Sequence, residues 1–106
     1  NDKDTPTEDV ISQLSALIYT LQVYNLPIML YSNKKGYSRF IKGRFDKYPL
    51  WICSFTDPPI DGKWLFWQYS HKGSVKGISG DTDLNTFNGS YTDWEHWIDS
   101  ISLKLQ

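Results

Sequence analysis

The chain has 106 residues and a formal net charge of −1, which allows one domain with a modest core. Hydrophobic residues make up 40% of the sequence, so its composition is that of a globular protein and not of a disordered one. Aromatic residues make up 16% while the charge is nearly balanced, which excludes the basic footprint typical of nucleic-acid-binding proteins.

The cysteine and histidine content predicts no metal or cofactor site. Cys53 is the single cysteine, so it cannot form an intrachain disulfide, and its place in an apolar run indicates a small buried hydrophobic residue. His71 and His96 lie far apart and lack ligands at metal-binding spacing, so we expect both at the surface. No apolar run is long enough to span a membrane, and no signal peptide is recognisable.

The N-terminal part predicts an amphipathic helix from about Pro6 to Tyr24. Thr5 can cap this helix, Pro6 suits its first position, and Glu8 completes a capping box. Apolar residues then recur at helical spacing as far as Tyr24. Asn25 is expected to end the helix.

The remainder of the chain predicts short strands that alternate with helices. The expected strands are 28–31, 50–55, 64–69 and 82–85, and the expected helices are 34–42, closed by Gly43, and a last helix that starts with a capping box at 92–95. This order indicates an α/β protein with a mostly parallel sheet. We expect the first three strands to be parallel, although the link between the second and third is short for a crossover.

Polar side chains recur at spacing two beside the most aromatic strand. Asp81, Asp83 and Asn85 would therefore share one face of the fourth strand. Two carboxylates and an amide near Trp51 and Trp67 suit a sugar site, because rings stack on the C–H faces of sugars while polar groups bind hydroxyls. An acid-rich turn after a core strand explains the pattern equally well.

Five segments of the chain carry a family resemblance: 67–70, 77–85 and 87–90, preceded by 27–32 and 48–52. They resemble the family-25 glycoside hydrolases, which are N-acetylmuramidases, or lysozymes, that cut peptidoglycan, and the two earlier segments resemble two earlier strands of that family. They lie in the family's order and cover nearly the whole chain. The resemblance implies a modified TIM-like β/α barrel.

A full barrel needs roughly 250 residues, and four expected strands correspond to the C-terminal half of the family's catalytic domain. We therefore expect residues 1–106 to form that half, with the N-terminal half of the same domain as its partner. The family's N-terminal Asp-x-Ser motif does not occur here, and no apolar strand of this chain ends in the Asp-x-Glu pair that carries the general acid. The pair Asp2 and Asp4 lacks the Glu, so the fragment alone is expected to be inactive.

The resemblance also implies roles for individual residues. Asp83 matches the family's late active-site aspartate, and the positions expected to line the sugar groove are Tyr31, Trp51, Trp67, Gln68, Asp81 and Asn85. The implied reaction is acid-assisted cleavage of the β-1,4 bond between N-acetylmuramic acid and N-acetylglucosamine. The implied location is secreted or at the cell envelope.

Two other classes of protein remain open at this stage. One is a non-catalytic glycan-binding module that uses the same aromatic groove. The other is a structural or interaction domain whose aromatic residues all lie in the core. The sequence that precedes Asn1 would discriminate among them, because an apolar strand ending in Asp-x-Glu supports the hydrolase.

Overall fold

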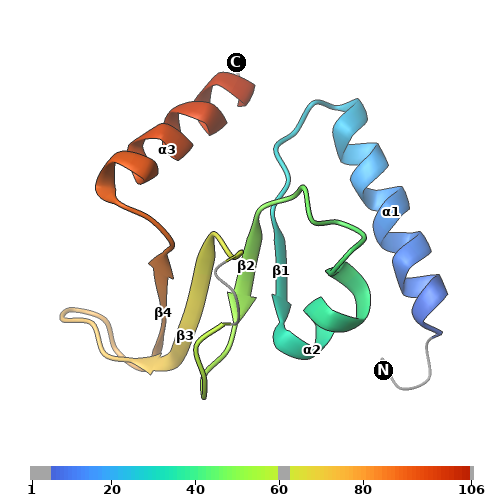
Figure 1. Ribbon diagram of the computed structural model, residues 1–106. Helices are drawn as coiled ribbons and strands as arrows, with labels where there is room; N and C mark the ends of the chain where they lie inside the picture. The colour runs from blue at the N-terminus through green and yellow to red at the C-terminus, as the bar shows by residue number, and fades with distance from the viewer. Residues whose placement is uncertain (1–5, 60–62, 106) are drawn as a thin grey trace.

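The computed structural model describes residues 6–59 and 63–105 and is a mixed α/β structure with one four-stranded sheet (Figure 1). In chain order the elements are α1 (Thr7–Val23), β1 (Leu30–Asn33), α2 (Lys34–Gly36), the π-helix η1 (Tyr37–Ile41), β2 (Leu50–Cys53), β3 (Phe66–Gly73), β4 (Thr82–Phe87) and α3 (Tyr91–Leu105). The expected cap Thr5, the pair Asp2 and Asp4, and the turn residues 60–62 lie outside the described residues.

The sheet has the strand order β1-β2-β3-β4. β1 is parallel to β2, and β2 is parallel to β3, which confirms the expected parallel arrangement. β4 returns antiparallel to β3. Within the described residues the sheet is open, with β1 and β4 as its two edges (Figure 1).

The backbone conformations of Pro6 and Asn25 set the two ends of α1. Pro6 precedes the first helical residue with an extended ψ of 138°, so the helix starts one residue later than predicted. At the other end the N–H of Asn25 donates to the carbonyl of Gln22 at 2.9 Å, and the N–H of Leu26 donates to that of Leu21 at 3.1 Å. This is a Schellman motif, and Asn25 adopts its left-handed conformation with φ of 56°, which confirms Asn25 as the end.

The boundaries of β1, β2 and β3 differ from the predicted ones. β1 runs over Leu30–Asn33 instead of 28–31, because it is in register with β2 and the N–H of Leu30 donates to the carbonyl of Pro49 at 2.9 Å. β3 continues to Gly73 through residues predicted as a loop, because β4 pairs back along it as far as Thr82. β2, in turn, ends at Cys53, two residues earlier than predicted.

The hydrophobic core lies between the sheet and the helices α1 and η1. Its buried residues are Ile18, Leu30, Ile41, Phe45, Leu50 and Ile52. Burying side chains of this size contributes about 1.5–3 kcal/mol each.

The predicted helix 34–42 is present as α2 followed by η1, where the N–H of Lys42 donates to the carbonyl of Tyr37 at 2.8 Å. No helix in the described part of the chain is long and apolar enough to cross a membrane.

The start of α3 differs from the prediction by two residues. The N–H of Ser90 donates to Oδ2 of Asp93 at 2.9 Å, and the N–H of Asp93 donates to Oγ of Ser90 at 3.1 Å. The capping box is therefore 90–93 and not 92–95. The turn after β4 dictates this, because Asn88 is held by the carbonyls of Trp64 and Leu65, and Ser90 is then the capping residue immediately before the first helical residue, Tyr91.

An aromatic cluster of Phe66, Phe87, Trp94 and Trp97 holds α3 at the amino end of β3 (Figure 1). The ring centroids of Phe66 and Trp97 lie 5.2 Å apart at 74°, and those of Phe87 and Trp94 lie 5.4 Å apart at 79°. Edge-to-face pairs of this kind contribute about 0.5–1.5 kcal/mol beyond burial. This cluster confirms that Trp94 and Trp97 belong to the packing of the last helix.

Candidate functional site

The two faces of the sheet carry different side chains. Residues in register point to the same face, and the face alternates along each strand. One face, here called the site face, carries Tyr31, Asn33, Trp51, Cys53, Phe66, Gln68, Asp83, Asn85 and Phe87. The opposite face, here called the helix face, carries Leu30, Ser32, Leu50, Ile52, Trp67 and Thr86, and its apolar residues pack against the helices.

Along the strands, the site face has an aromatic part at one end and a polar part at the other. At the amino end of β3, Phe66 packs under Trp94 and Trp97 of α3. At the carboxyl ends of the parallel strands the side chains are polar, and Asn33, Cys53 and Gln68 are in register there. In open α/β sheets, ligands bind outside the carboxyl ends of the parallel strands. The polar half of the site face is therefore the candidate site.

Tyr31 and Gln68 join the outer strands of the parallel part. The hydroxyl of Tyr31 donates to Oε1 of Gln68 at 2.7 Å, and the Gln68 side chain is only 6% exposed. The pKa of Tyr31 is raised above its ordinary value of 10.0, first by a side-chain hydrogen bond with Cys53, then by burial and by electrostatic interactions with Cys53 and Asp83. The environment thus keeps this hydroxyl protonated.

Trp51 and Asn85 form the second cross-strand pair. The indole Nε1 of Trp51 on β2 donates to Oδ1 of Asn85 on β4 at 2.8 Å. The ring of Tyr31 packs edge-on against Trp51, with centroids 4.8 Å apart at 73°. Tyr31 itself remains 52% exposed. Two aromatic rings therefore stand on the open part of the site face, and each is held by an amide oxygen.

Asp83 lies two residues before Asn85 on β4, so its carboxylate is on the same face. Its negative charge contributes to the raised pKa of Tyr31, which places the carboxylate within electrostatic reach of that hydroxyl. Asp81 precedes β4 and is exposed. The structure thus brings Tyr31, Trp51, Gln68, Asp83 and Asn85 together, with Asp81 at the margin.

Trp67 does not join this group. It is in register with Ile52 and Thr86, which places it on the helix face, where it packs against the core and lies 6.0 Å from Trp64 between ring centroids. Its Nε1 donates to the carbonyl of Ser54 at 2.9 Å. An aromatic run such as 64–69 does not reveal which rings face the core, so Trp67 could not be assigned to a face without the register.

Cys53 is on the site face and not in the core where it was predicted. It is partly exposed, in register with Gln68, and its thiol interacts with the Tyr31 hydroxyl. The sequence contained a signal for this position, because Trp51 and Cys53 are two residues apart in one strand and must share a face. The prediction for Cys53 gave more weight to its apolar neighbours in the sequence than to the alternation of side chains along the strand.

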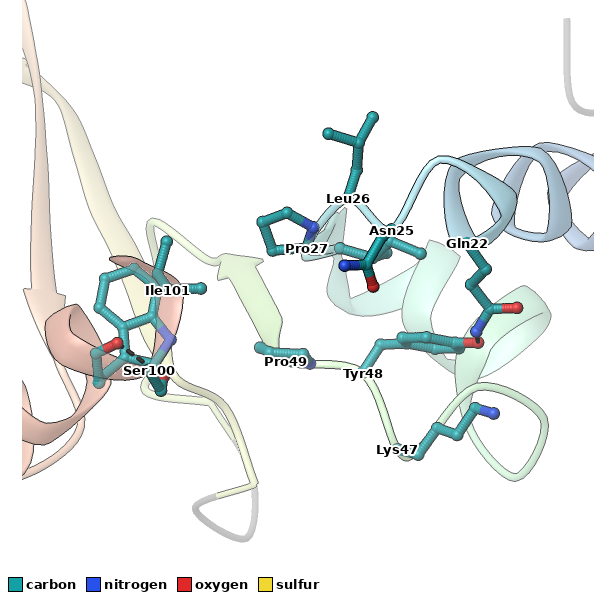
Figure 2. A pocket seen from close by; sticks show the side chains of 11 residues that line it. Gln22, Asn25, Leu26, Pro27, Lys47, Tyr48, Pro49, Ser100 and Ile101 are labelled. Carbon is teal, nitrogen blue, oxygen red and sulfur yellow. Dashed lines mark hydrogen bonds between the residues drawn. The ribbon is translucent and has the colours of Figure 1, made fainter. Parts of the chain in front are cut away.

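A cavity of about 560 Å³ lies at the opposite end of the sheet (Figure 2). Figure 2 shows Ser100 and Ile101 of α3 on one side and Pro27 and Pro49, which precede β1 and β2, on the other. The cavity therefore adjoins the amino ends of the strands and is separate from the polar half of the site face.

Among the described residues no group of three or more His, Cys, Asp or Glu side chains is placed to hold a metal ion.

Comparisons with known proteins identify the family. The family model described as "Glycosyl hydrolases family 25" matches residues 1–78. The protein YegX of Escherichia coli strain K12 is 37% identical over 76 residues, which are 69% of this chain and 28% of YegX. Lysozyme M1 of Streptomyces globisporus is 45% identical over 53 residues, which are 45% of this chain and 18% of that protein.

The structural comparison extends the match beyond the residues of the family model. The structure of a family 25 glycosyl hydrolase from Bacillus anthracis superimposes with a TM-score of 0.74 and 30% identity, and covers 90% of this chain and 47% of that chain. The present chain thus spans at most about half the length of these relatives. From the matched sequence and the shared fold, the chain belongs to the glycosyl hydrolases family 25.

Proposed function

We propose that this chain supplies the C-terminal half of the catalytic barrel of a peptidoglycan-cleaving lysozyme. The observation that carries the proposal is the polar half of the site face, where Asp83 lies within electrostatic reach of Tyr31, whose exposed ring packs against the partly buried ring of Trp51. Support comes from the family and from relatives that include Lysozyme M1. The proposed substrate bond is the β-1,4 bond between N-acetylmuramic acid and N-acetylglucosamine.

In this proposal the residues of the site face have different roles in binding and in catalysis. Trp51 and Tyr31 present ring surface to the sugar C–H faces, and Asp83 stabilises positive charge that develops on the sugar ring at the transition state. The general acid is the family's Glu from the N-terminal half of the same domain, which would also enclose the site face. The glycan strand of peptidoglycan is then the partner, and the location is secreted or at the cell envelope.

The experiment uses the full-length protein that contains this chain and purified peptidoglycan. Clearance of the suspension is followed, and the new reducing ends are reduced with borohydride and identified after hydrolysis. We expect muramic acid at the new ends, because cleavage after N-acetylmuramic acid frees its C1. New ends of glucosamine would contradict the proposed bond, and a suspension that does not clear would contradict the hydrolase.

A second candidate is a glycan-binding module that lacks hydrolysis. It is favoured by the aromatic rings of Tyr31 and Trp51 on the site face, which suit a sugar whether or not a general acid stands beside them. Co-sedimentation of the full-length protein with peptidoglycan separates the two candidates. A binding module sediments with the polymer and releases no reducing ends, whereas the hydrolase releases them.

A further inference from the structure

We propose that Asn85 is a positioning residue that fixes the indole ring of Trp51 and does not itself hold the glycan. The inference rests on the proposed function, because it takes Trp51 as a surface for sugar. It departs from the expectation that Asn85 lines the sugar groove as a ligand. The role of Asn85 would be to act on substrate affinity through Trp51.

The hydrogen bond determines how the Asn85 amide is oriented. An indole N–H can only donate, so the atom of Asn85 that lies 2.8 Å from Nε1 of Trp51 must be the carbonyl oxygen. The positioning role therefore rests on the amide oxygen of Asn85, whereas the two donors of its NH₂ group take no part in it. A variant that keeps an oxygen acceptor and loses the NH₂ donors thus tests the positioning role by itself.

Trp51 is restrained from two directions. Asn85 holds its nitrogen from β4, and the Tyr31 ring packs against it from β1 with the two ring centroids 4.8 Å apart. Tyr31 is in turn held by the buried amide of Gln68. A ring that is already held in one orientation loses little conformational entropy when a sugar stacks on it, so preorganisation favours binding. Release of the nitrogen would weaken binding more than it slows the chemical step.

Two substitutions separate the positioning role from a ligand role. Asn85→Asp retains an oxygen acceptor for the indole and removes the NH₂ group, whereas Asn85→Leu removes both. Initial clearance rates of the full-length protein over a range of peptidoglycan concentrations give kcat and apparent KM. We expect about a tenfold rise in apparent KM for Asn85→Leu, little change in kcat, and rescue in Asn85→Asp.

Trp51→Phe provides the decisive background, because it keeps a ring and removes the N–H donor. If Asn85 acts through Trp51, adding Asn85→Leu to Trp51→Phe has no further effect on apparent KM. Thr86→Val is the matched control, since Thr86 is exposed on the same strand and points to the helix face. Equal damage by Asp and Leu at position 85, or the same effect of Asn85→Leu in both backgrounds, would overturn the proposal.

A spectroscopic readout tests the contact independently of activity. In a ¹H–¹⁵N spectrum of the full-length protein, the indole signal of Trp51 is identified by its loss in Trp51→Phe. We expect Asn85→Leu to move this signal upfield and Asn85→Asp to leave it downfield. An unmoved signal in Asn85→Leu would refute the positioning role. Absence of clearance by the wild type would refute the proposed function, while this signal still decides whether Asn85 holds Trp51.

Discussion

The hydroxyl of Tyr31 on β1 donates to Oε1 of Gln68 on β3 at 2.7 Å, across the intervening strand β2. Gln68 is almost completely buried, while Tyr31 is half exposed. The bond therefore connects the interior of the sheet to its open surface. It gives one pair of residues both a structural role and a place in the candidate site.

Tyr31→Phe should destabilise the fold. The substitution leaves the buried amide oxygen of Gln68 without its donor, and an unpaired buried acceptor costs about 1–3 kcal/mol. Urea unfolding of the full-length protein measures the change in the free energy of unfolding. Tyr19→Phe is the control, because the Tyr19 side chain on α1 is 69% exposed. Equal stability of Tyr31→Phe and wild type would show that the bond contributes nothing.

The raised pKa of Tyr31 predicts a loss of stability at alkaline pH. In the folded state the neutral phenol is favoured by Cys53, burial and the charge of Asp83, so the unfolded chain loses its proton first. The contribution is therefore fully present below the unfolded pKa of 10.0 and is lost as pH rises through the higher folded pKa. Phenolate absorbance, taken as the difference from Tyr31→Phe, gives this pKa.

Cys53→Ala tests the cause of that shift. Removing the thiol removes the largest contribution, so the midpoint of the Tyr31 titration should move back toward 10.0. A midpoint that stays in place in Cys53→Ala would show that the thiol is not responsible.

The observed capping box predicts unequal effects at two hydroxyl residues near the start of α3. Ser90→Ala removes the acceptor for the N–H of Asp93 and should cost about 1 kcal/mol. Thr92→Ala should cost clearly less, because Thr92 lies inside the first turn. Urea unfolding of both variants measures the difference. A larger loss for Thr92→Ala would favour the box predicted at 92–95.

Gly73→Ala should destabilise the β3–β4 pair. A Cβ at position 73 would collide with Cγ and both methyl carbons of Leu84, and such overpacking costs about 1–3 kcal/mol. Adding Leu84→Ala should recover part of the loss, because it removes the atoms in collision. Additive losses in the double variant would show that Leu84 does not fill the space above Gly73.

The most reliable predictions came from the hydrophobic periodicity of the helices and from the residues that end them. Asn25 ends α1 because few other residues accept a left-handed conformation, and the amphipathic stripe of α3 follows from its spacing. The boundaries of β1 and β3 were harder to place, because they depend on which residues of distant segments form pairs. Leu30 starts β1 through its bond to Pro49, and no local pattern contains that contact.

For the candidate site, too, local spacing was sufficient to place some residues, whereas others required the register of distant strands. The spacing of Asp83 and Asn85 was sufficient to place both on one face of β4. The pairing of Trp51 with Asn85 requires the register of three strands, and the assignment of Trp67 to the helix face requires it as well. Cys53 could have been placed beside Trp51 by strand alternation, had the apolar run not been taken as core on both faces.

The most direct test of the account is the clearance rate of peptidoglycan by Asp83→Asn in the full-length protein, measured beside its urea unfolding midpoint. Asp83→Asn preserves shape and removes charge, so we expect turnover to fall about 10²–10³-fold with stability nearly unchanged. Asp81→Asn, at a position before β4 and so outside the strand that carries Asp83, should retain most of the rate. Wild-type clearance by Asp83→Asn would contradict the account, since it would remove Asp83 from the site.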